Sequence, residues 1–467
     1  MRRAPLLLCV LAALFLPGRA GAADFTTQDV ALTMDDGVTI FASLLEPVGT
    51  APAGGWPAVI MFHGLGGSHR DTAALGAAFA SRGYAVLAPD ARAHGASGGL
   101  FSLDGPREVQ DARNEFDWLA ARPEVSDTQI GAWGISLGGG AVLNSAVAGV
   151  PWKALETVET WSDLYGALFP QNLGKSGAIF LFSRLVRSDR IDPALAPLLA
   201  DMLRNRNLTA IKQLFGSRSS LSRLGSLRVP TLLMQGRRDF AFDIDQATQA
   251  YRRLAGPKAL YIGDFGHPPS TFPGPDLNVV LDFGARWFDE YVRRAPVERI
   301  PSVTVAPDPW SGRPVAFGGV PPVRTVSWRL PGRTTIGPNG KVVRTAKVAG
   351  AVEQFGAPVV RLRLSGTAGW SHVVAVLSAV TRSGETVLSE GGAQVGLTAK
   401  PQTVPVRLIS DGNLIPAGAR LRVTVAATST AQSPANLLYL LGLQRGARLT
   451  VGASTLTLPV LRTRVSR

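Results

Sequence analysis

Cysteine is almost absent from this chain: Cys9 is the only one among 467 residues. One cysteine cannot close an internal disulfide, and Cys9 lies in an N-terminal segment that we expect to be removed. The rest of the chain therefore offers no thiol nucleophile and no thiolate ligand for a metal. It also has no H-E-x-x-H pattern and no paired histidines at ligand spacing, so we expect neither a metal nor another cofactor.

Long apolar runs are missing as well. Beyond the N-terminus, no stretch reaches the ~18 consecutive apolar residues of a transmembrane helix. The N-terminus carries Arg2 and Arg3, an apolar core over residues 6–16, and a small-x-small cleavage site that ends at Ala22. This arrangement predicts a secretory signal peptide over residues 1–22, with bacterial export to the periplasm or the medium. The apolar core is short for an uncleaved anchor, so we expect no stable membrane insertion after removal of the signal.

The charge is strongly positive, at +14, but it is not concentrated. Basic residues are scattered along the chain and aromatic residues do not interleave with them, unlike in nucleic-acid-binding surfaces. We therefore expect no nucleic-acid partner. A hydrophobic fraction of 46% and a charged fraction of 18% are typical of a folded globular protein with two or three domains.

The most informative motif is Gly-Ile-Ser-Leu-Gly at residues 134–138. An apolar run at 128–133 precedes it and a run of small residues at 139–146 follows it, which predicts a strand, a sharp turn and a helix. In a G-x-S-x-G turn of this kind the serine hydroxyl is exposed above the sheet, where it can act as a nucleophile. Ser136 is the candidate nucleophile; an ordinary turn serine is the alternative.

Two strand-and-loop segments precede this motif. Residues 58–68 form an apolar run into a His-Gly-Leu-Gly-Gly loop, which in serine hydrolases supplies the first oxyanion donor. We expect the backbone N–H groups of Leu65 and Leu137 to be the two donors of the oxyanion hole. Residues 84–97 form a strand that continues into a loop similar to the D-x-R-G-H-G-x-S loop of such enzymes, with Ala93 at the usual first glycine.

An acid and a histidine follow in the order that this class of hydrolase uses. The predicted strand at 229–236 leads to Asp239, and the predicted strand at 258–263 leads to His267. Asp239 would hold and stabilise His267, which would take the proton from Ser136 and return it to the leaving group. Asp243 lies close enough along the chain to be an alternative acid.

The other four histidines have different interpretations. We expect His63 and His94 to brace their own loops by hydrogen bonds. His69 is expected to be exposed, and His372 falls in the C-terminal β-rich region.

The chain divides into three predicted parts. Residues 1–22 are the signal, and residues 23–298 are expected to form an α/β-hydrolase domain with a mainly parallel sheet. Within it, residues 151–227 are rich in aromatic residues and show little strand character, which predicts a helical cap over the site; a packing extension of the core is the alternative. Residues 301–467 alternate in short runs split by Gly, Pro and Asn turns, which predicts an all-β jelly roll or β-sandwich.

A hydrolase core with a helical cap and a C-terminal jelly roll resembles the Xaa-Pro dipeptidyl-peptidase and cocaine-esterase-like hydrolases. The segments 160–165, 403–408 and 414–423 are similar to segments of that family. The resemblance implies a triad of Ser136, Asp239 and His267 that transfers an acyl group from an ester or amide bond through an acyl-enzyme. Many members use a tyrosine hydroxyl in the oxyanion hole; the loop here has none, so two backbone donors are expected.

Two functions from different classes follow. The first is an exported serine hydrolase that cleaves a small-molecule ester or a peptide amide bond. The second is a carbohydrate- or surface-binding protein that uses its jelly roll, with the hydrolase core secondary. It is motivated by the glycan binding of many jelly rolls and by a basic chain that we expect to be exported, although fold analogy alone does not establish binding.

Overall fold

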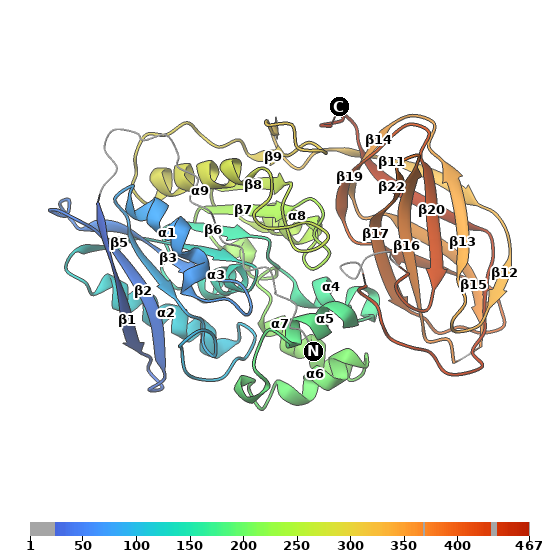
Figure 1. Cartoon of the computed structure of the whole chain (residues 1–467), viewed down its shortest axis with the longest axis horizontal. Helices are drawn as coiled ribbons and strands as arrows, with labels where there is room; N and C mark the ends of the chain where they lie inside the picture. Colours follow the sequence, from blue (N-terminus) through green and yellow to red (C-terminus); the bar gives the residue numbers. More distant parts are fainter. Residues whose placement is uncertain (1–23, 368, 431–436, 467) are drawn as a thin grey trace.

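The computed structural model describes residues 24–367, 369–430 and 437–466. The predicted signal peptide and Cys9 lie outside the described residues. In Figure 1 an α/β part and a β-rich C-terminal part lie side by side, and a group of short helices lies below and between them. Among the described residues, no helix is both long enough and apolar enough to cross a membrane.

A ten-stranded sheet, ordered β1-β2-β4-β3-β5-β6-β7-β8-β9-β10, forms the centre of the α/β part. Its strands are β1 (Phe25–Thr33), β2 (Thr39–Pro47), β3 (Trp56–Phe62), β4 (Ala85–Pro89), β5 (Val125–Ile135), β6 (Leu155–Val158), β7 (Thr231–Gly236), β8 (Lys258–Gly263), β9 (Val303–Val305) and β10 (Val315–Phe317). β1 and β2 form an antiparallel hairpin, as predicted, while β3 to β9 pair in parallel. Parallel strands end at the same edge of a sheet, so the loops after β3, β5, β6, β7 and β8 meet there.

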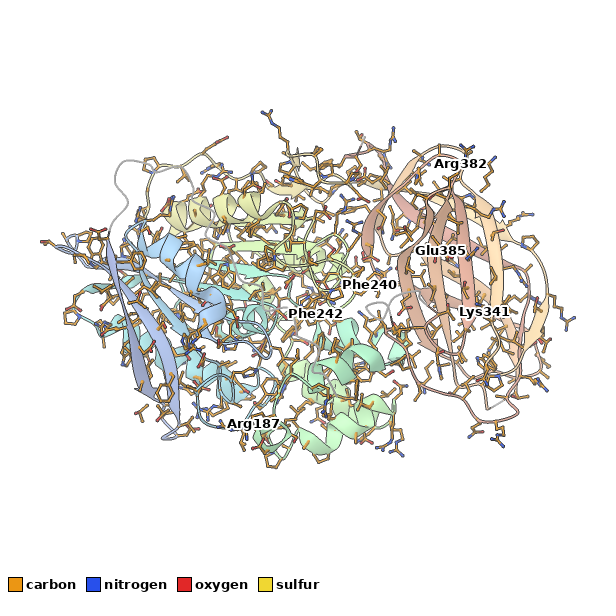
Figure 2. All side chains as sticks on the ribbon, viewed as in Figure 1. Arg187, Phe240, Phe242, Lys341, Arg382 and Glu385 are labelled. Atoms are coloured by element: carbon orange, nitrogen blue, oxygen red, sulfur yellow. The ribbon has the colours of Figure 1, made fainter. Side chains whose placement is uncertain are left out.

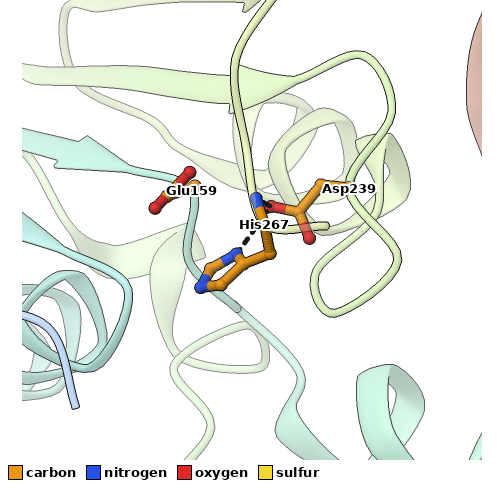
Figure 3. Close-up of side chains that lie close together, drawn as sticks. All are labelled: Glu159, Asp239 and His267. Carbon is orange, nitrogen blue, oxygen red and sulfur yellow. Dashed lines mark hydrogen bonds and ion pairs between the residues drawn. The ribbon is translucent and has the colours of Figure 1, made fainter. Parts of the chain in front are cut away.

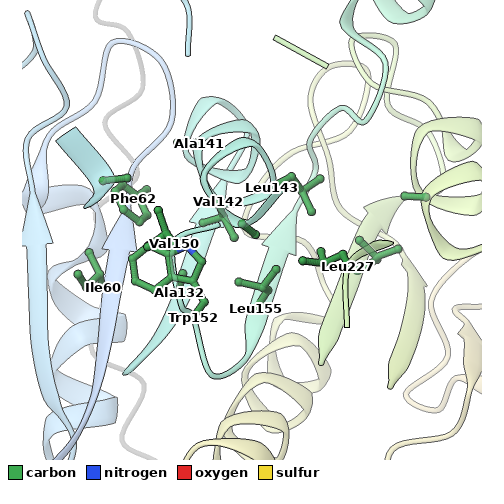
Figure 4. Close-up of a cluster of buried hydrophobic side chains, with 14 of the residues drawn as sticks. Ile60, Phe62, Ala132, Ala141, Val142, Leu143, Val150, Trp152, Leu155 and Leu227 are labelled. Atoms are coloured by element: carbon green, nitrogen blue, oxygen red, sulfur yellow. The ribbon is translucent and has the colours of Figure 1, made fainter. Parts of the chain in front are cut away.

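Helices cover both faces of this sheet. α2 (Pro106–Ala120), α3 (Leu137–Val147) and α8 (Ile244–Arg253) share one hydrophobic core, whereas α1 (Ala73–Ala80) and α9 (Leu277–Tyr291) share the other. Figure 4 shows Val142 and Leu143 of α3 close to Ala132 and Leu155 of the strands beneath. This packing fixes the N-terminus of α3, and with it Ser136, at the carboxyl edge of the sheet.

The hydrophobic spacing of residues 279–293 predicts an amphipathic helix with Leu281, Ala285, Phe288 and Val292 along one face, and the structure confirms this only in part. Phe288 and Val292 are buried, but Leu281 and Ala285 are half-buried. The face of α9 that packs against the sheet is formed instead by other residues, among them Val280, Phe283 and Trp287.

The helical segment lies between β6 and β7. It contains α4 (Leu164–Leu168), α5 (Ser176–Ser183), α6 (Ala196–Leu203) and α7 (Leu208–Ser217), joined by short 3₁₀ turns. The predicted start at residue 151 differs from the structure, because β6 is a central strand of the sheet and Trp152 packs in the core against Phe62 and Phe116. The helices begin only after β6.

The C-terminal part consists of two antiparallel sheets of eight and four strands around one apolar core. The strands of the larger sheet are β11 (Val323–Leu330), β12 (Thr334–Ile336), β14 (Val352–Gly356), β15 (Val359–Gly366), β18 (Gln402–Arg407), β19 (Asp411–Ile415), β21 (Leu449–Val451) and β22 (Ser454–Leu461). Those of the smaller sheet are β13 (Val342–Lys347), β16 (His372–Thr381), β17 (Gly384–Gln394) and β20 (Arg420–Ala426). This is the predicted β-sandwich, but β9 and β10 join the ten-stranded sheet, so the sheet of the first part extends past residue 301.

Candidate active site

Ser136 occupies a sharp turn between β5 and α3. Its backbone has φ 53° and ψ −115°, a conformation that residues other than glycine rarely adopt. A Cβ atom on Gly134 would overlap the Gly138 carbonyl, and one on Gly138 would overlap the Phe62 carbonyl. The two glycines of the motif are therefore required by the close approach of three backbone segments, and the turn presents the serine side chain at the sheet edge.

Ser136, His267 and Asp239 form one hydrogen-bonded chain. The Ser136 Oγ lies 2.9 Å from His267 Nε2, and His267 Nδ1 lies 2.8 Å from Asp239 Oδ2. The three residues come from the loops after β5, β8 and β7, so the structure brings together all three residues that the sequence singled out. Figure 3 shows the imidazole of His267 with the Asp239 carboxylate on one side.

Asp239 is fully buried and held by its own loop. Its Oδ1 accepts hydrogen bonds from the backbone N–H groups of Ala241 and Phe242, both at 2.9 Å. The alternative acid, Asp243, accepts from the backbone N–H of Ser410 at 3.0 Å and so is directed toward the C-terminal part.

The charge on His267 depends on its carboxylate neighbours. Burial disfavours the protonated imidazole, but the carboxylates of Asp239 and Glu159 outweigh it and raise the pKa of His267 to about 9. The higher pKa makes His267 a stronger base. It also reduces the fraction of His267 that is neutral near pH 7, and only the neutral imidazole can accept a proton.

Glu159 was not identified from the sequence. It directly follows β6, has φ 40°, is 5% exposed and lines the same cavity as Ser136 and His267. Burial raises its pKa to about 7, although the positive charge on His267 opposes the shift. The sequence feature that could have identified Glu159 is an acidic residue immediately after a strand. That strand, β6, has only four residues and lies in a stretch for which the sequence predicts helices.

Glu159, Asp239 and His267 also have the spacing of a metal site, since one donor atom of each lies within 4.8 Å of the others. Both imidazole nitrogens of His267 are already hydrogen-bonded, to Ser136 and to Asp239. The donor set present therefore fits a proton-transfer chain better than a metal ion.

The candidate oxyanion donors lie in the same cavity as Ser136. Leu65 and Leu137 both line the cavity, and Leu137 is the first residue of α3, where a backbone N–H has no acceptor within the helix. His63 braces this loop: its Nδ1–H donates to the Gly64 carbonyl at 2.7 Å, and its Nε2 accepts from the Ala91 N–H at 2.9 Å. Burial, with a smaller contribution from the nearby His94, lowers the pKa of His63 to about 4, so this imidazole is neutral.

The remaining histidines are structural. His94 Nδ1 lies 3.0 Å from the Arg92 carbonyl, and His372 in β16 lies 3.0 Å from the Leu441 carbonyl. The prediction that His69 is exposed was wrong: its side chain is 15% exposed and bonds to Asp90 at 2.8 Å.

A cavity of about 520 Å³ opens at the Ser136 hydroxyl. Its walls come from the loops of the sheet edge and from the helices between β6 and β7, and they are mostly apolar. The rings of Phe242 and Phe182 flank His267, with centroids 5.3 and 6.4 Å from that of the imidazole. No tyrosine occurs among the described residues that line this cavity.

The fold and the site are those of a hydrolase. Residues 36–269 match the X-Pro dipeptidyl-peptidase (S15) family, and residues 323–437 match the X-Pro dipeptidyl-peptidase C-terminal non-catalytic domain. The chain belongs to the X-Pro dipeptidyl-peptidase (S15) family, and the resemblance inferred from the sequence is confirmed. The comparisons do not favour the alternative of a carbohydrate- or surface-binding protein.

Solved structures share both parts of the fold. A CocE/NonD family hydrolase from Staphylococcus aureus is 15% identical, with 94% of each chain covered and a TM-score of 0.74. An alpha-amino acid ester hydrolase is 16% identical, with 98% of this chain and 100% of the other covered and a TM-score of 0.69. At these identities the likeness shows a common fold.

Curated relatives match over shorter stretches. The quorum-quenching protein AidA from Acinetobacter baumannii is 36% identical over 98 residues, which is 19% of this chain and 31% of that protein. An uncharacterized protein from Escherichia coli is 34% identical over 106 residues, which is 22% of this chain and 35% of the relative. The matches thus span about a third of the length of these relatives.

Proposed function

We propose that this protein is a serine hydrolase that cleaves esters through an acyl-enzyme formed on Ser136. The observation that carries the proposal is the continuous chain from Ser136 Oγ to His267 (2.9 Å) and from His267 to the buried Asp239 (2.8 Å). A nucleophile hydrogen-bonded to a base, with the base oriented by a third group, is the geometry of nucleophilic acyl transfer.

The chemistry follows from these positions. Ser136 Oγ attacks the acyl carbon while its proton passes to His267 Nε2, and the Nδ1–H of His267 keeps its hydrogen bond to the Asp239 carboxylate. The carbonyl oxygen becomes an oxyanion and accepts hydrogen bonds from the backbone N–H groups of Leu65 and Leu137. His267 then protonates the leaving alcohol. A water molecule, deprotonated by His267, attacks the acyl carbon, releases the acid and restores Ser136.

The cavity favours an apolar ester over a charged peptide. Two carboxylates, Asp71 and Glu159, are among its lining groups. Asp71 already accepts the backbone N–H of Ser68 at 2.7 Å, and Glu159 lies beside His267. The rest of the wall suits an aliphatic or aromatic acyl group, so we infer that such esters are hydrolysed faster than Xaa-Pro amides.

The test is the reaction of the purified protein with a fluorophosphonate, read as intact mass. The wild-type protein should gain one adduct and Ser136→Ala none. Ser183→Ala is the matched control, because Ser183 lines the same cavity and its removal should leave the adduct in place. Adduct formation on Ser136→Ala would refute the assignment.

The substrate class is tested with a panel of p-nitrophenyl esters and Xaa-Pro p-nitroanilides. We expect kcat/KM to rise from the acetyl to the hexanoyl ester by about 10-fold or more, as burial of additional methylene groups predicts. Faster cleavage of the anilides would favour a dipeptidyl-peptidase instead.

We also propose that the protein is exported, on the strength of the charged, apolar and small-x-small segments of residues 1–22. Expression of the full chain in a bacterium, followed by fractionation and N-terminal sequencing, should give a periplasmic or secreted protein that begins at Ala23. Recovery from the cytoplasm with an intact N-terminus would contradict export.

A further inference from the structure

Glu159 directly follows β6, a strand that lies between two of the strands that supply the site. β6 lies between β5, which leads to Ser136, and β7, which leads to Asp239. The Ser136 N–H donates to the Val158 carbonyl at 2.9 Å, and the Glu159 N–H donates to the Met234 carbonyl at 2.8 Å. Both neighbours of β6 therefore fix the backbone at Glu159, so its side chain is held in place beside the imidazole.

The Glu159 carboxylate has one buried oxygen that receives no hydrogen bond from any residue that the structure describes. Its Oε2 is inaccessible and has no partner within the described ranges. An unpaired buried carboxylate is unfavourable unless a positive charge or a proton compensates it. The titratable groups that act on it are His267 and Asp239, and Lys175 from the N-terminus of α5 acts on both of those.

In the proposed reaction, the neutral form of His267 becomes positively charged beside Glu159. When His267 takes the proton from Ser136, it becomes an imidazolium with Asp239 at Nδ1 and Glu159 close by, as Figure 3 shows. In the low dielectric of the protein interior, a second carboxylate within 4.8 Å stabilises the cation by Coulomb attraction, without a hydrogen bond.

We propose that Glu159 is a positioning residue for His267: a second carboxylate that stabilises its protonated form and partly replaces Asp239 as its acidic partner when Asp239 is removed. The inference rests on the proposed function, since it assigns a role within the same proton-transfer chain. It implies that two acids, from adjacent strands, set the proton affinity of one histidine.

The first experiment compares the pH dependence of the fluorophosphonate labelling rate in the wild type and in Glu159→Gln. Loss of the second carboxylate should move the acid limb of the profile down by about one pH unit, because the protonated imidazole is less stabilised. The variant should then label faster than the wild type near pH 7 and more slowly at high pH. A defect in folding or packing alone lowers the rate at every pH and produces no such crossover.

Glu156→Gln is the matched control. Glu156 is a buried glutamate of the same strand, but its carboxylate packs against Gly284 of α9, away from the imidazole. Its replacement should leave the acid limb in place. If Glu159→Gln also leaves it in place, the proposal is overturned. Glu159→Asp, which keeps the charge, should restore most of the wild-type profile.

A double-mutant cycle tests the second half of the proposal. In an Asp239→Asn background, Glu159→Gln should lower the labelling rate at pH 9 by about 10-fold or more, compared with a few-fold in the wild type. Equal effects in the two backgrounds would show that Glu159 does not substitute for Asp239.

The protonation of His267 can also be followed without turnover. NMR titration of ring-labelled histidine, assigned with His267→Gln, should show a lower pKa for His267 in Glu159→Gln than in the wild type. If the wild type fails to label, the proposed hydrolase function fails, yet this titration still decides the role of Glu159. An unchanged pKa would refute it.

Discussion

At the scale of single residues, Ser136 carries the proposed nucleophile on a backbone conformation that is strained. Its φ of 53° is strained for a residue with a Cβ, and the crowded glycines around it leave the turn no room to relax. The sequence could predict this residue because its motif lies between a predicted strand and a predicted helix, and two matching strand-and-loop segments precede it. Asp239 and His267 were predictable for a similar reason, since each follows a long apolar strand.

Replacement of Ser136 by glycine should therefore stabilise the fold while it abolishes activity. Glycine adopts positive φ without strain, so we expect Ser136→Gly to unfold at higher denaturant than Ser136→Ala, by about 1 kcal/mol. Chemical denaturation of the two inactive variants measures the difference. Equal stability would mean that the turn is not strained.

Glu159 and His69 show where residue-level prediction failed. Each depends on a partner from a distant segment: His69 is half-buried and bonds to Asp90, and Glu159 is buried beside His267. A local pattern carries no information about such pairings.

At the scale of elements, α5 divides its aromatic residues between the cavity and the surface. Phe182 faces His267 and lines the cavity, whereas Phe180 is 54% exposed. The sequence predicted that aromatic residues in this region cover the site, but it could not say which ones, because a helix of eight residues presents several of them on different sides.

The two phenylalanines of α5 should thus respond differently to truncation. We expect Phe182→Ala to lower kcat/KM for a hexanoyl ester by about 10-fold, because it removes apolar wall and admits water beside His267. Phe180→Ala is the control and should leave the kinetics unchanged. Similar losses in both variants would show a general effect of the helix.

Glu156 of β6 makes the stability of the fold depend on pH. Burial raises the pKa of Glu156 to about 8 from 4.5, so the folded protein keeps a proton that the unfolded chain releases in this window. The free energy of unfolding should consequently fall as pH rises from about 4.5 to about 8. Glu156→Gln removes the titration and should be more stable than the wild type at pH 8, by about 2–4 kcal/mol, but not at pH 4.5. Thermal unfolding at both pH values measures this, and an equal difference at the two would contradict it.

At the scale of the whole molecule, the β-sandwich supports the loop that carries Asp239. Lys175 donates to the carbonyls of Phe240 and Ala241, at 2.7 and 3.1 Å, and Arg237 donates to the Gly412 carbonyl at 2.9 Å. Figure 2 shows Phe240 at the junction of the two parts, and it packs there with Tyr439. The acid loop is therefore shared between the sheet, the helical segment and the sandwich.

Arg237 gives a test of this coupling. It forms a buried ion pair with Glu353 at 3.3 Å, both side chains being 1% exposed. Arg237→Met leaves the carboxylate without its cation and should cost about 3–5 kcal/mol, with a lower fluorophosphonate labelling rate because Asp239 follows in the same loop. Arg187→Met, which breaks an exposed pair with Asp189, is the control. Calorimetry should show a large shift only for the first variant; equal shifts would refute the coupling.

The architecture as a whole was largely predictable, because the order of strands, helices and short β-runs follows the hydrophobic pattern. Its boundaries were not. β6 has four residues and β9 has three, too few for a pattern, and each is defined by the strands it pairs with. Glu159 was missed for the same reason, because its position depends on the pairing of β6 with β5 and β7, which a local sequence pattern does not reveal.

The shared acid loop has a consequence for synthesis. A ribosome makes Asp239 well before it makes Gly412 and Tyr439, which hold the loop from the other side. The nucleophile turn, by contrast, is complete once its own sheet has formed. An incomplete chain would thus carry the serine turn without full support for the loop of its acid.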